Sequence, residues 1–297
     1  MLERAVMDNA EAAAEQQPSR RALRRFLRNR MAVAALVVLI LLHAAVAAAP
    51  LLTPHSPEAL NLLKRLRPPS ADHLLGTDEM GRDILARLLY GGRVSLGIGL
   101  AAMGGAVALG TLLGSAAGFR GGWVDAIIMR ITDAMMSFPL FFFLLTVLAL
   151  LGSSIANIVA VIALTSWMNV ARIVRAEVLR IKQMQFVEAA RALGSSPLRV
   201  LFRHVLPHCL SSVVVSATLG VGSAILTESA LSYLGLGVTP PAPSWGNMLN
   251  SGRSHIWTAP HLVLFPGAMI FITVLAYNAL GDGLRDALDP ASSRDSR

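Results

Sequence analysis

The side chains best placed for chemistry in this sequence are ionisable residues that interrupt long apolar segments. Arg130 and Asp133 lie in one such segment, and Glu228 lies in another. Arg130 and Asp133 stand three residues apart, on one helical face, so we expect them to pair; contact with a solute is the alternative. Ionisable residues within apolar helices usually face a bundle interior or an aqueous path. Glu228 is therefore expected either to line such a path or to pack in a hydrogen-bonded site between helices.

A second polar group, formed by Thr77, Asp78, Arg82 and Asp83, lies in a proline-punctuated stretch between apolar segments. Thr77 or Asp78 can cap a helix that runs to about Tyr90, because short oxygen-bearing side chains accept hydrogen bonds from the first backbone N–H groups. Arg82 and Asp83 would then present charges beside the apolar layer. These four residues are predicted either to form a gate or a contact with a partner protein, or to be solvated charges on a capped helix.

Motifs for covalent chemistry are absent from the sequence. Neither of the two lysines, Lys64 and Lys182, follows a glycine, so the G-x-x-x-x-G-K-[ST] loop that cradles phosphates is missing. The sequence also lacks H-E-x-x-H and G-x-S-x-G, which leaves a hydrolase without support. Cys209 is the only cysteine, so no intrachain disulfide and no cysteine-based metal site is expected. We therefore predict that this chain is not an enzyme and holds no cofactor or metal.

The elements that must position these residues are predicted to be membrane-spanning helices. Hydrophobic residues make up 54% of the chain and charged residues 15%, against roughly 25% charged residues in soluble domains. The apolar residues form several runs of about 18 or more, the length that a bilayer requires. The net charge of +8 comes from basic residues that flank these runs, which favours a lipid bilayer over nucleic acid as the partner. The predicted fold class is an all-α polytopic membrane protein.

Six transmembrane helices are predicted, at about residues 31–52, 93–119, 124–151, 155–174, 210–234 and 261–280. The first could instead be a cleaved signal, because Ala47-Ala48-Ala49 resembles a signal-peptidase site. Its long apolar run and long polar leader favour an uncleaved helix. Most lysines and arginines lie on the side that holds the N-terminus and the segment before His208. The positive-inside rule therefore predicts that both termini are cytoplasmic.

This topology divides the chain into five parts. They are a basic cytoplasmic segment (1–30), the first helix (31–52), an external segment (53–92), a five-helix core (93–285) and a cytoplasmic tail (286–297). The first 17 residues are expected to lack fixed structure. In the second span, Gly110, Gly114 and Gly118 share one helical face and predict a close packing seam. Packing within the chain is the expected use of this seam, and a partner subunit is the alternative.

The segment 185–207, between the fourth and fifth spans, is predicted to form two short helices joined by a turn. Gly194 ends the first helix in a left-handed conformation, Ser196 caps the second, and Pro197 suits its first position. The apolar faces are assigned to Phe186, Ala190 and Leu193 in the first helix and to Leu198, Leu201, Phe202 and Val205 in the second, which is expected to end before Pro207. Such an element either docks into a partner or lies in the lipid headgroup layer.

The residues Glu188-Ala189-Ala190, Gly194 and Leu206-Pro207 resemble the EAA loop of ATP-binding-cassette importer permeases. In that family the loop forms coupling helices that insert into a cleft on the ATPase subunit. The resemblance implies that these residues lie at that contact. One position departs from the pattern, because His204 stands where the family usually has an aliphatic residue.

Three further stretches resemble the dipeptide, oligopeptide and nickel branch of this family. They are 75–83, which is similar to LGTD-x-x-GRD; 231–246, which is similar to an external loop; and Asn278, Gly281-Asp282-Gly283-Leu284-Arg285-Asp286 and Leu288-Asp289-Pro290 near the C-terminus. The motifs occur in order and cover nearly the whole chain after about Arg24.

The resemblance implies a permease subunit of a bacterial inner-membrane importer for dipeptides or oligopeptides. The implied partners are a second, similar permease, two ATPase subunits that bind ATP and Mg²⁺, and an extracytoplasmic solute-binding protein. Nickel or another small solute is the alternative cargo. A membrane scaffold that transports nothing is the alternative from a different class, and it would leave the ATP turnover of its partner unaffected.

Overall fold

The computed structural model describes residues 18–288, and these form helices and connecting segments without a β-sheet. The first 17 residues, and the last two residues of the motif 288–290, lie outside the described part. The helices are α2 (Pro18–Arg28), α3 (Arg30–Ala47), α4 (Ala49–Leu52), α5 (Ile84–Arg120), α6 (Gly122–Met136), α7 (Leu140–Leu151), α8 (Ile155–Ile181), α9 (Gln185–Ala192), α10 (Pro197–Val200), α11 (Leu206–Tyr233), α12 (Trp245–Gly252) and α13 (His261–Leu288). The all-α prediction is confirmed.

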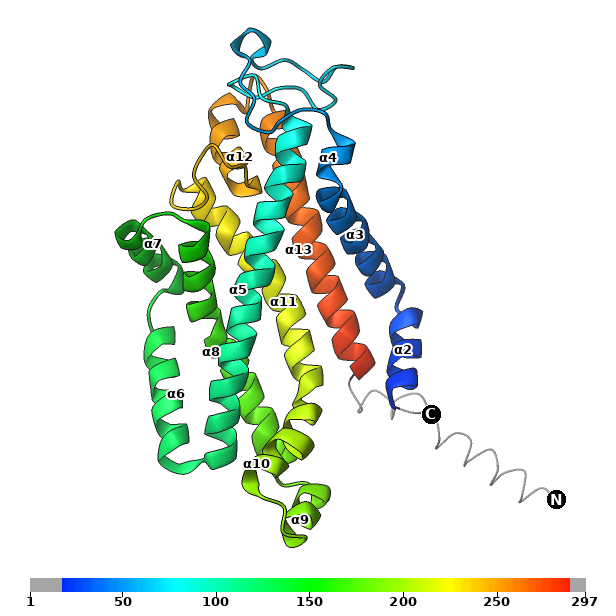
Figure 1. The fold of residues 1–297 in the computed structure, drawn as a ribbon, viewed down its shortest axis with the longest axis vertical. Coiled ribbons are helices and arrows are strands. Elements are labelled where there is room, and N and C mark those ends of the chain that lie inside the picture. The colour runs from blue at the N-terminus through cyan, green and yellow to red at the C-terminus, as the bar shows by residue number, and fades with distance from the viewer. Residues whose placement is uncertain (1–17, 289–297) are drawn as a thin grey trace, which may run out of the picture.

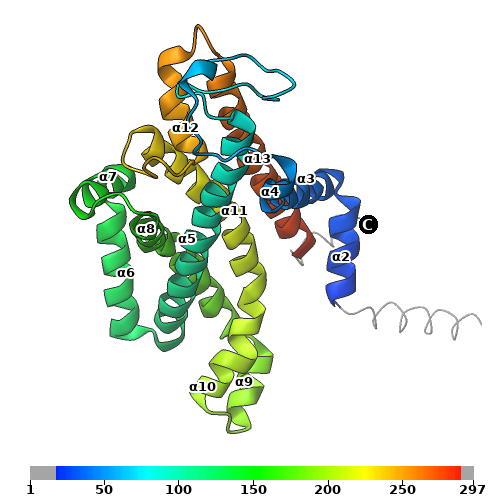
Figure 2. The same ribbon diagram turned by 45° about the horizontal axis from the view of Figure 1, so that its top comes forward.

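The long helices form an elongated bundle (Figure 1). α5 packs along α8, α11 packs against both α5 and α13, and α3 lies along α13. Residues 53–83, the part of the predicted external segment 53–92 that precedes α5, lie with α12 at one end of the bundle, which we call the α12 end. The short helices α9 and α10 protrude from the opposite end, the α9 end (Figures 1 and 2).

Five stretches are long and apolar enough to cross a membrane: α3, α5, α8, the continuous helical stretch Pro197–Tyr233, and α13. The predicted third span, 124–151, is not one straight helix. It consists of α6 and α7, which meet at a bend of 84°. Pro139 stands at the break, where it lacks a backbone N–H and disfavours a helical conformation in the residue before it. The predicted six spans are therefore five helices and one bent pair.

α5 is longer than predicted, because the expected short helix ending near Tyr90 and the second span are one helix of 37 residues. The glycines that follow Tyr90 provide close packing and do not break the helix. A Cβ on Gly92 would lie 2.7 Å from a methyl group of Val46 and 3.0 Å from the ring of Trp245. These glycines therefore let α3 and α12 approach α5.

The predicted glycine seam on α5 packs within the chain, against α8. A Cβ on Gly110 would lie 2.5 Å from the Cβ of Val170, and one on Gly118 would lie 2.9 Å from the carbonyl oxygen of Arg175. Backbone contact of this closeness requires glycine at these positions. The expectation of intrachain packing is confirmed.

Candidate functional site

The turn between α9 and α10 has the local structure that the sequence predicts. Gly194 follows α9 with φ +80°, a conformation that residues with a side chain rarely adopt. Ser196 Oγ accepts a hydrogen bond from the backbone N–H of Arg199 at 3.4 Å, and Pro197 is the first residue of α10. The helix stop, the cap and the restart are thus confirmed.

The predicted apolar faces of this element are only partly correct. In α9, Ala190 is buried beside Val187, whereas Phe186 and Leu193 are exposed. The side chains of α9 and α10 that pack inward are those facing the ends of α8 and α11, so tertiary packing decides the buried face of such short helices. Leu201 and Val205 are buried as predicted, but Leu198 and Phe202 are 67% and 65% exposed.

The exposed apolar side chains form a surface at the tip of the α9 end, which we call the apolar tip. It consists of Phe186, Leu193, Leu198 and Phe202, of which Leu193 is 87% exposed. Exposed apolar residues grouped in this way are typical of an interaction site. Beside them, an open and mainly apolar groove of about 830 Å³ runs between α5 and the Pro197–Val213 stretch.

The second short helix does not end before Pro207, contrary to the prediction. A π-helical turn at Leu201–Val205 joins α10 to α11, and the N–H of Leu206 donates to the carbonyl of Leu201. Pro207 lies in the first turn of α11, directly after this π-helical turn, and it lacks the backbone N–H that a continuing helix would use. The π-helical turn thus accommodates Pro207 without a break in the helical stretch. The apolar tip is therefore continuous with a membrane-spanning helix.

The predicted coupling residues divide between the surface and the interior of this element. Glu188, Ala189, Gly194 and Pro207 are exposed, Leu206 is half-buried, and Ala190 is buried. The exposed members are available to a partner, whereas Ala190 holds α9 against the bundle. Their role in coupling remains a prediction.

Glu228 lies in a buried polar cluster between α5, α11 and α12. Its carboxylate is fully buried and accepts hydrogen bonds from the hydroxyl groups of Ser232 at 2.7 Å and Ser95 at 3.0 Å. Ser95 Oγ in turn accepts from the N–H of Trp245 at 3.2 Å, and Ser232 Oγ accepts from the N–H of Val238 at 2.9 Å. This arrangement favours the packing role of Glu228 over a role in lining a path.

The expected Arg130–Asp133 pair is wrong. Asp133 instead bonds to Arg172 of α8 at 2.6 Å, and Asp125 forms a bidentate pair with Arg175. Within the described residues Arg130 is exposed and makes no ion pair. Both carboxylates of α6 thus reach arginines of α8. These ion pairs connect α6 to α8.

The four predicted residues of the external segment are buried, so the expectation of solvated charges is wrong. Asp78 Oδ2 bonds to Arg82 Nε at 2.6 Å and lies 3.4 Å from Arg87 Nε. The helix cap is neither Thr77 nor Asp78: it is Asp83, whose Oδ1 accepts from the N–H of Ala86 at 2.7 Å. Their predicted role in a gate or a partner contact remains a prediction, and burial means that any such contact would be indirect.

Several residues of these networks were missed because their signals are weak. Ser95 and Ser232 look like ordinary small residues of an apolar helix, and Arg172 and Arg175 look like part of the basic flank. Ser95 stands 133 residues from Glu228, and only folding brings the two together, whereas Ser232 lies one helical turn from Glu228 on α11. The four-residue spacing of Glu228 and Ser232, which places both on one helical face, is the signal in the sequence that points to this site.

Together, the spans and the protruding α9–α11 element define a polytopic helical membrane protein with exposed apolar side chains at one end. The family model described as binding-protein-dependent transport system inner membrane component matches residues 110–294. The N-terminal TM domain of oligopeptide transport permease C matches residues 17–69. The chain belongs to this family of transport permeases and is a multi-pass protein of the bacterial inner membrane. The resemblance found in the sequence is confirmed.

Curated relatives match over most of their length. A glutathione transport system permease protein from Pectobacterium atrosepticum is 46% identical, over 92% of this chain and 91% of the relative. A dipeptide transport system permease protein from Alkalihalophilus pseudofirmus is 43% identical, over 92% and 90%. A putative peptide permease protein from Brucella suis is 45% identical, over 92% and 91%.

Proposed function

We propose that this chain is one of two permease subunits that together form the path of a dipeptide or oligopeptide importer. A solute-binding protein outside the membrane delivers the cargo, and two ATPase subunits inside supply the energy. The relatives are named for glutathione, a dipeptide and peptides, which supports a peptide over nickel. ATP and Mg²⁺ bind to the ATPase subunits, because this sequence has no phosphate-binding loop.

The observation that carries the proposal is the continuity of the apolar tip with α11. A partner that binds Leu198 and Phe202 holds one end of a helical stretch of 37 residues. Displacement of the tip therefore moves a membrane-spanning helix without an intervening flexible joint. The ATPase subunits drive the cycle if their ATP-bound and ATP-free forms favour different positions of this tip. The spans then alternate between outward and inward openings as rigid bodies.

The proposed orientation places the α9 end in the cytoplasm and the α12 end outside. Cysteines introduced at two exposed positions test it: Leu193→Cys at the α9 end and Leu63→Cys at the α12 end, where Leu63 is 90% exposed. The native Cys209 is buried and gives a low background. In intact cells, a membrane-impermeant maleimide is expected to label only the Leu63→Cys variant. Labelling of the Leu193→Cys variant alone would indicate the opposite orientation, with the α9 end outside.

ATPase activity of the assembled transporter in lipid tests the function. We expect turnover to rise when binding protein loaded with peptide is added, and we expect Glu188→Ala to lose or uncouple this stimulation. The matched control is Glu58→Ala, which removes an exposed glutamate from the external segment and should leave coupling unchanged.

Each outcome separates the alternatives. Stimulation by nickel but not by peptide keeps the mechanism and replaces the cargo. A complete assembly whose turnover responds to no solute, and in which Glu188→Ala behaves as wild type, favours the scaffold.

A further inference from the structure

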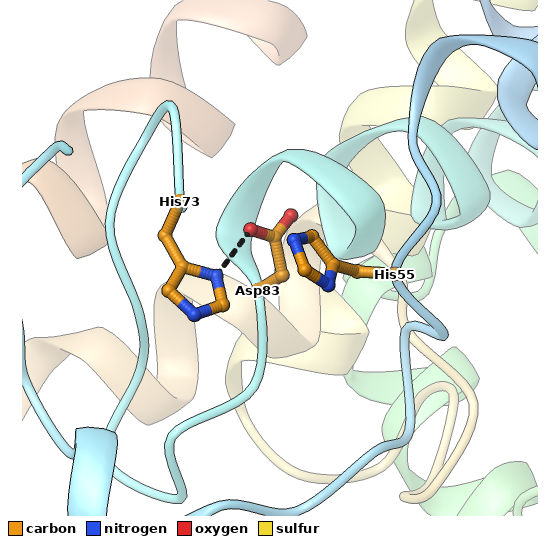
Figure 3. Close-up of side chains that lie close together, drawn as sticks. All are labelled: His55, His73 and Asp83. Carbon is orange, nitrogen blue, oxygen red and sulfur yellow. Dashed lines mark hydrogen bonds and ion pairs between the residues drawn. The ribbon is translucent and has the colours of Figure 1, made fainter. Parts of the chain in front are cut away.

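Two histidines and an aspartate from separate parts of the external segment meet near the start of α5. His55 follows α4, His73 lies between Ser70 and Gly76, and Asp83 caps α5. One ligand atom of each residue lies within 4.8 Å of the other two. His73 and Asp83 are buried and His55 is half-buried, so the cluster is protected on one side and accessible on the other. Figure 3 shows both rings approaching the carboxyl group of Asp83.

We propose that His55, His73 and Asp83 form a site for a divalent transition-metal ion, with Zn²⁺ as the best match. Imidazole nitrogens and a carboxylate oxygen are ligands that Zn²⁺ prefers, and three protein ligands with one open position make a common coordination set. The proposal does not depend on the transported solute. It concerns the external segment alone.

The geometry is close to what such an ion requires. His73 Nδ1 lies 2.9 Å from Asp83 Oδ2, and ligands of a tetrahedral zinc ion stand about 3 to 3.5 Å apart. Asp83 uses its other oxygen to cap α5, so Oδ2 remains available. The His55 ring lies 4.8 Å from the His73 ring, centroid to centroid. Because the three ligand atoms lie within 4.8 Å of one another, His55 must move closer to complete the set.

The hydrogen bonds indicate what the ion replaces. The Nζ of Lys64 lies 3.3 Å from His73 Nε2, and because an ammonium group only donates, Nε2 accepts this bond. Nδ1 therefore carries the ring proton and donates it to Asp83. A metal ion on Nδ1 displaces that proton. The neutral ring then carries its proton on Nε2, which can no longer accept a hydrogen bond from Lys64. Lys64 can turn toward Asp72, whose carboxylate already lies 3.7 Å away.

This competition makes the role of Lys64 diagnostic. As a cation beside the site, Lys64 opposes metal binding, so Lys64→Gln is expected to bind Zn²⁺ more tightly than wild type. A cluster that serves only as a hydrogen-bonded fastening for the external segment would lose stability in the same variant and gain no affinity for metal.

Zinc binding by the assembled transporter in lipid nanodiscs, with no histidine tag, tests the site. We expect wild type to bind one more Zn²⁺ per permease chain than His55→Ala, with the affinity of this site lowered at least tenfold in that variant. The control is His255→Ala, a half-buried histidine of the α12 end outside the cluster, which should bind as wild type does. His73→Ala should also lose the ion, but this residue is buried, so His55→Ala is the deciding variant. Retention of the ion by His55→Ala, at wild-type affinity, overturns the proposal.

Discussion

Replacement of Glu228 by glutamine separates its packing role from a role in the transport path. The carboxyl group accepts from three serine hydroxyls, those of Ser95, Ser229 and Ser232. Backbone N–H groups of Trp245 and Val238 orient the hydroxyls of Ser95 and Ser232. In Glu228→Gln one acceptor oxygen becomes an NH₂ donor, so one serine hydroxyl loses its acceptor. A buried polar group without a partner costs about 1 to 3 kcal/mol. Glu228→Ala removes both acceptors and leaves a cavity, so its cost is expected to be larger, about 2 to 5 kcal/mol.

The measurement is equilibrium unfolding of the purified protein in mixed micelles, together with peptide uptake by reconstituted transporter. Glu228→Gln is expected to lower the free energy of unfolding by about 1 to 3 kcal/mol while uptake by the folded fraction is retained. Cleavage by added protease within residues 234–244 should also rise, because the serine cluster anchors this loop through Ser232. Glu58→Gln, at an exposed position, is the matched control and should change neither quantity.

The opposite pattern would refute this reasoning. If the Glu228→Gln variant unfolds as wild type does but fails to transport, then transport requires the carboxyl group itself, and Glu228 belongs to the path. A variant that unfolds and transports as wild type does would show that one unpaired hydroxyl at this site is tolerated.

Two further predictions concern helix packing. Gly114→Ala should destabilise the fold by about 1 to 3 kcal/mol, because its Cβ would lie 2.9 Å from the Cα of Ala171. The control is Gly104→Ala, whose Cβ would have no atom within 4 Å, so this variant should keep the wild-type stability. Equal free energies of unfolding for the two variants would argue against the seam. In a double-mutant cycle on the free energy of unfolding, Asp133 and Arg172, which bond at 2.6 Å, should show a coupling energy of about 0.2 to 1 kcal/mol. Asp133 and Arg130 should show none. A coupling energy between Asp133 and Arg130 would instead support the pair expected from the sequence.

The sequence was most informative where the determinants are local. Ser196, Pro197 and Gly194 act on backbone within a few residues of themselves, so the turn between α9 and α10 could be predicted together with its cap. The glycine seam of α5 was equally predictable, because a four-residue spacing marks one helical face regardless of the neighbour. Which helix packs against the seam, namely α8, is known only from the tertiary structure.

Partners that lie far apart in the sequence could not be predicted. Asp133 pairs with Arg172, 39 residues away, and Ser95 bonds to Glu228, 133 residues away. Spacing alone favours Arg130, the nearest candidate, whereas in the folded chain Asp133 pairs with Arg172 of α8. The same limit applies to α9, whose buried face depends on the helix ends beneath it.

The distribution of these contacts indicates which parts of the permease move together. The stretch Pro197–Tyr233 carries Leu198 and Phe202 of the apolar tip near one end and Glu228 near the other, and it is about 55 Å long at 1.5 Å per residue. Displacement of the tip strains the buried serine cluster unless α5 and α12 follow, and each hydrogen bond to the carboxyl group is worth about 0.5 to 1.5 kcal/mol. Movement of α5, α11 and α12 as one body therefore costs less than separation of these helices. In α6, by contrast, Thr132 is the one buried residue. Ion pairs at the surface of α6 connect this helix to α8. We therefore expect the rearrangement that opens the path to fall between α6 and the bundle.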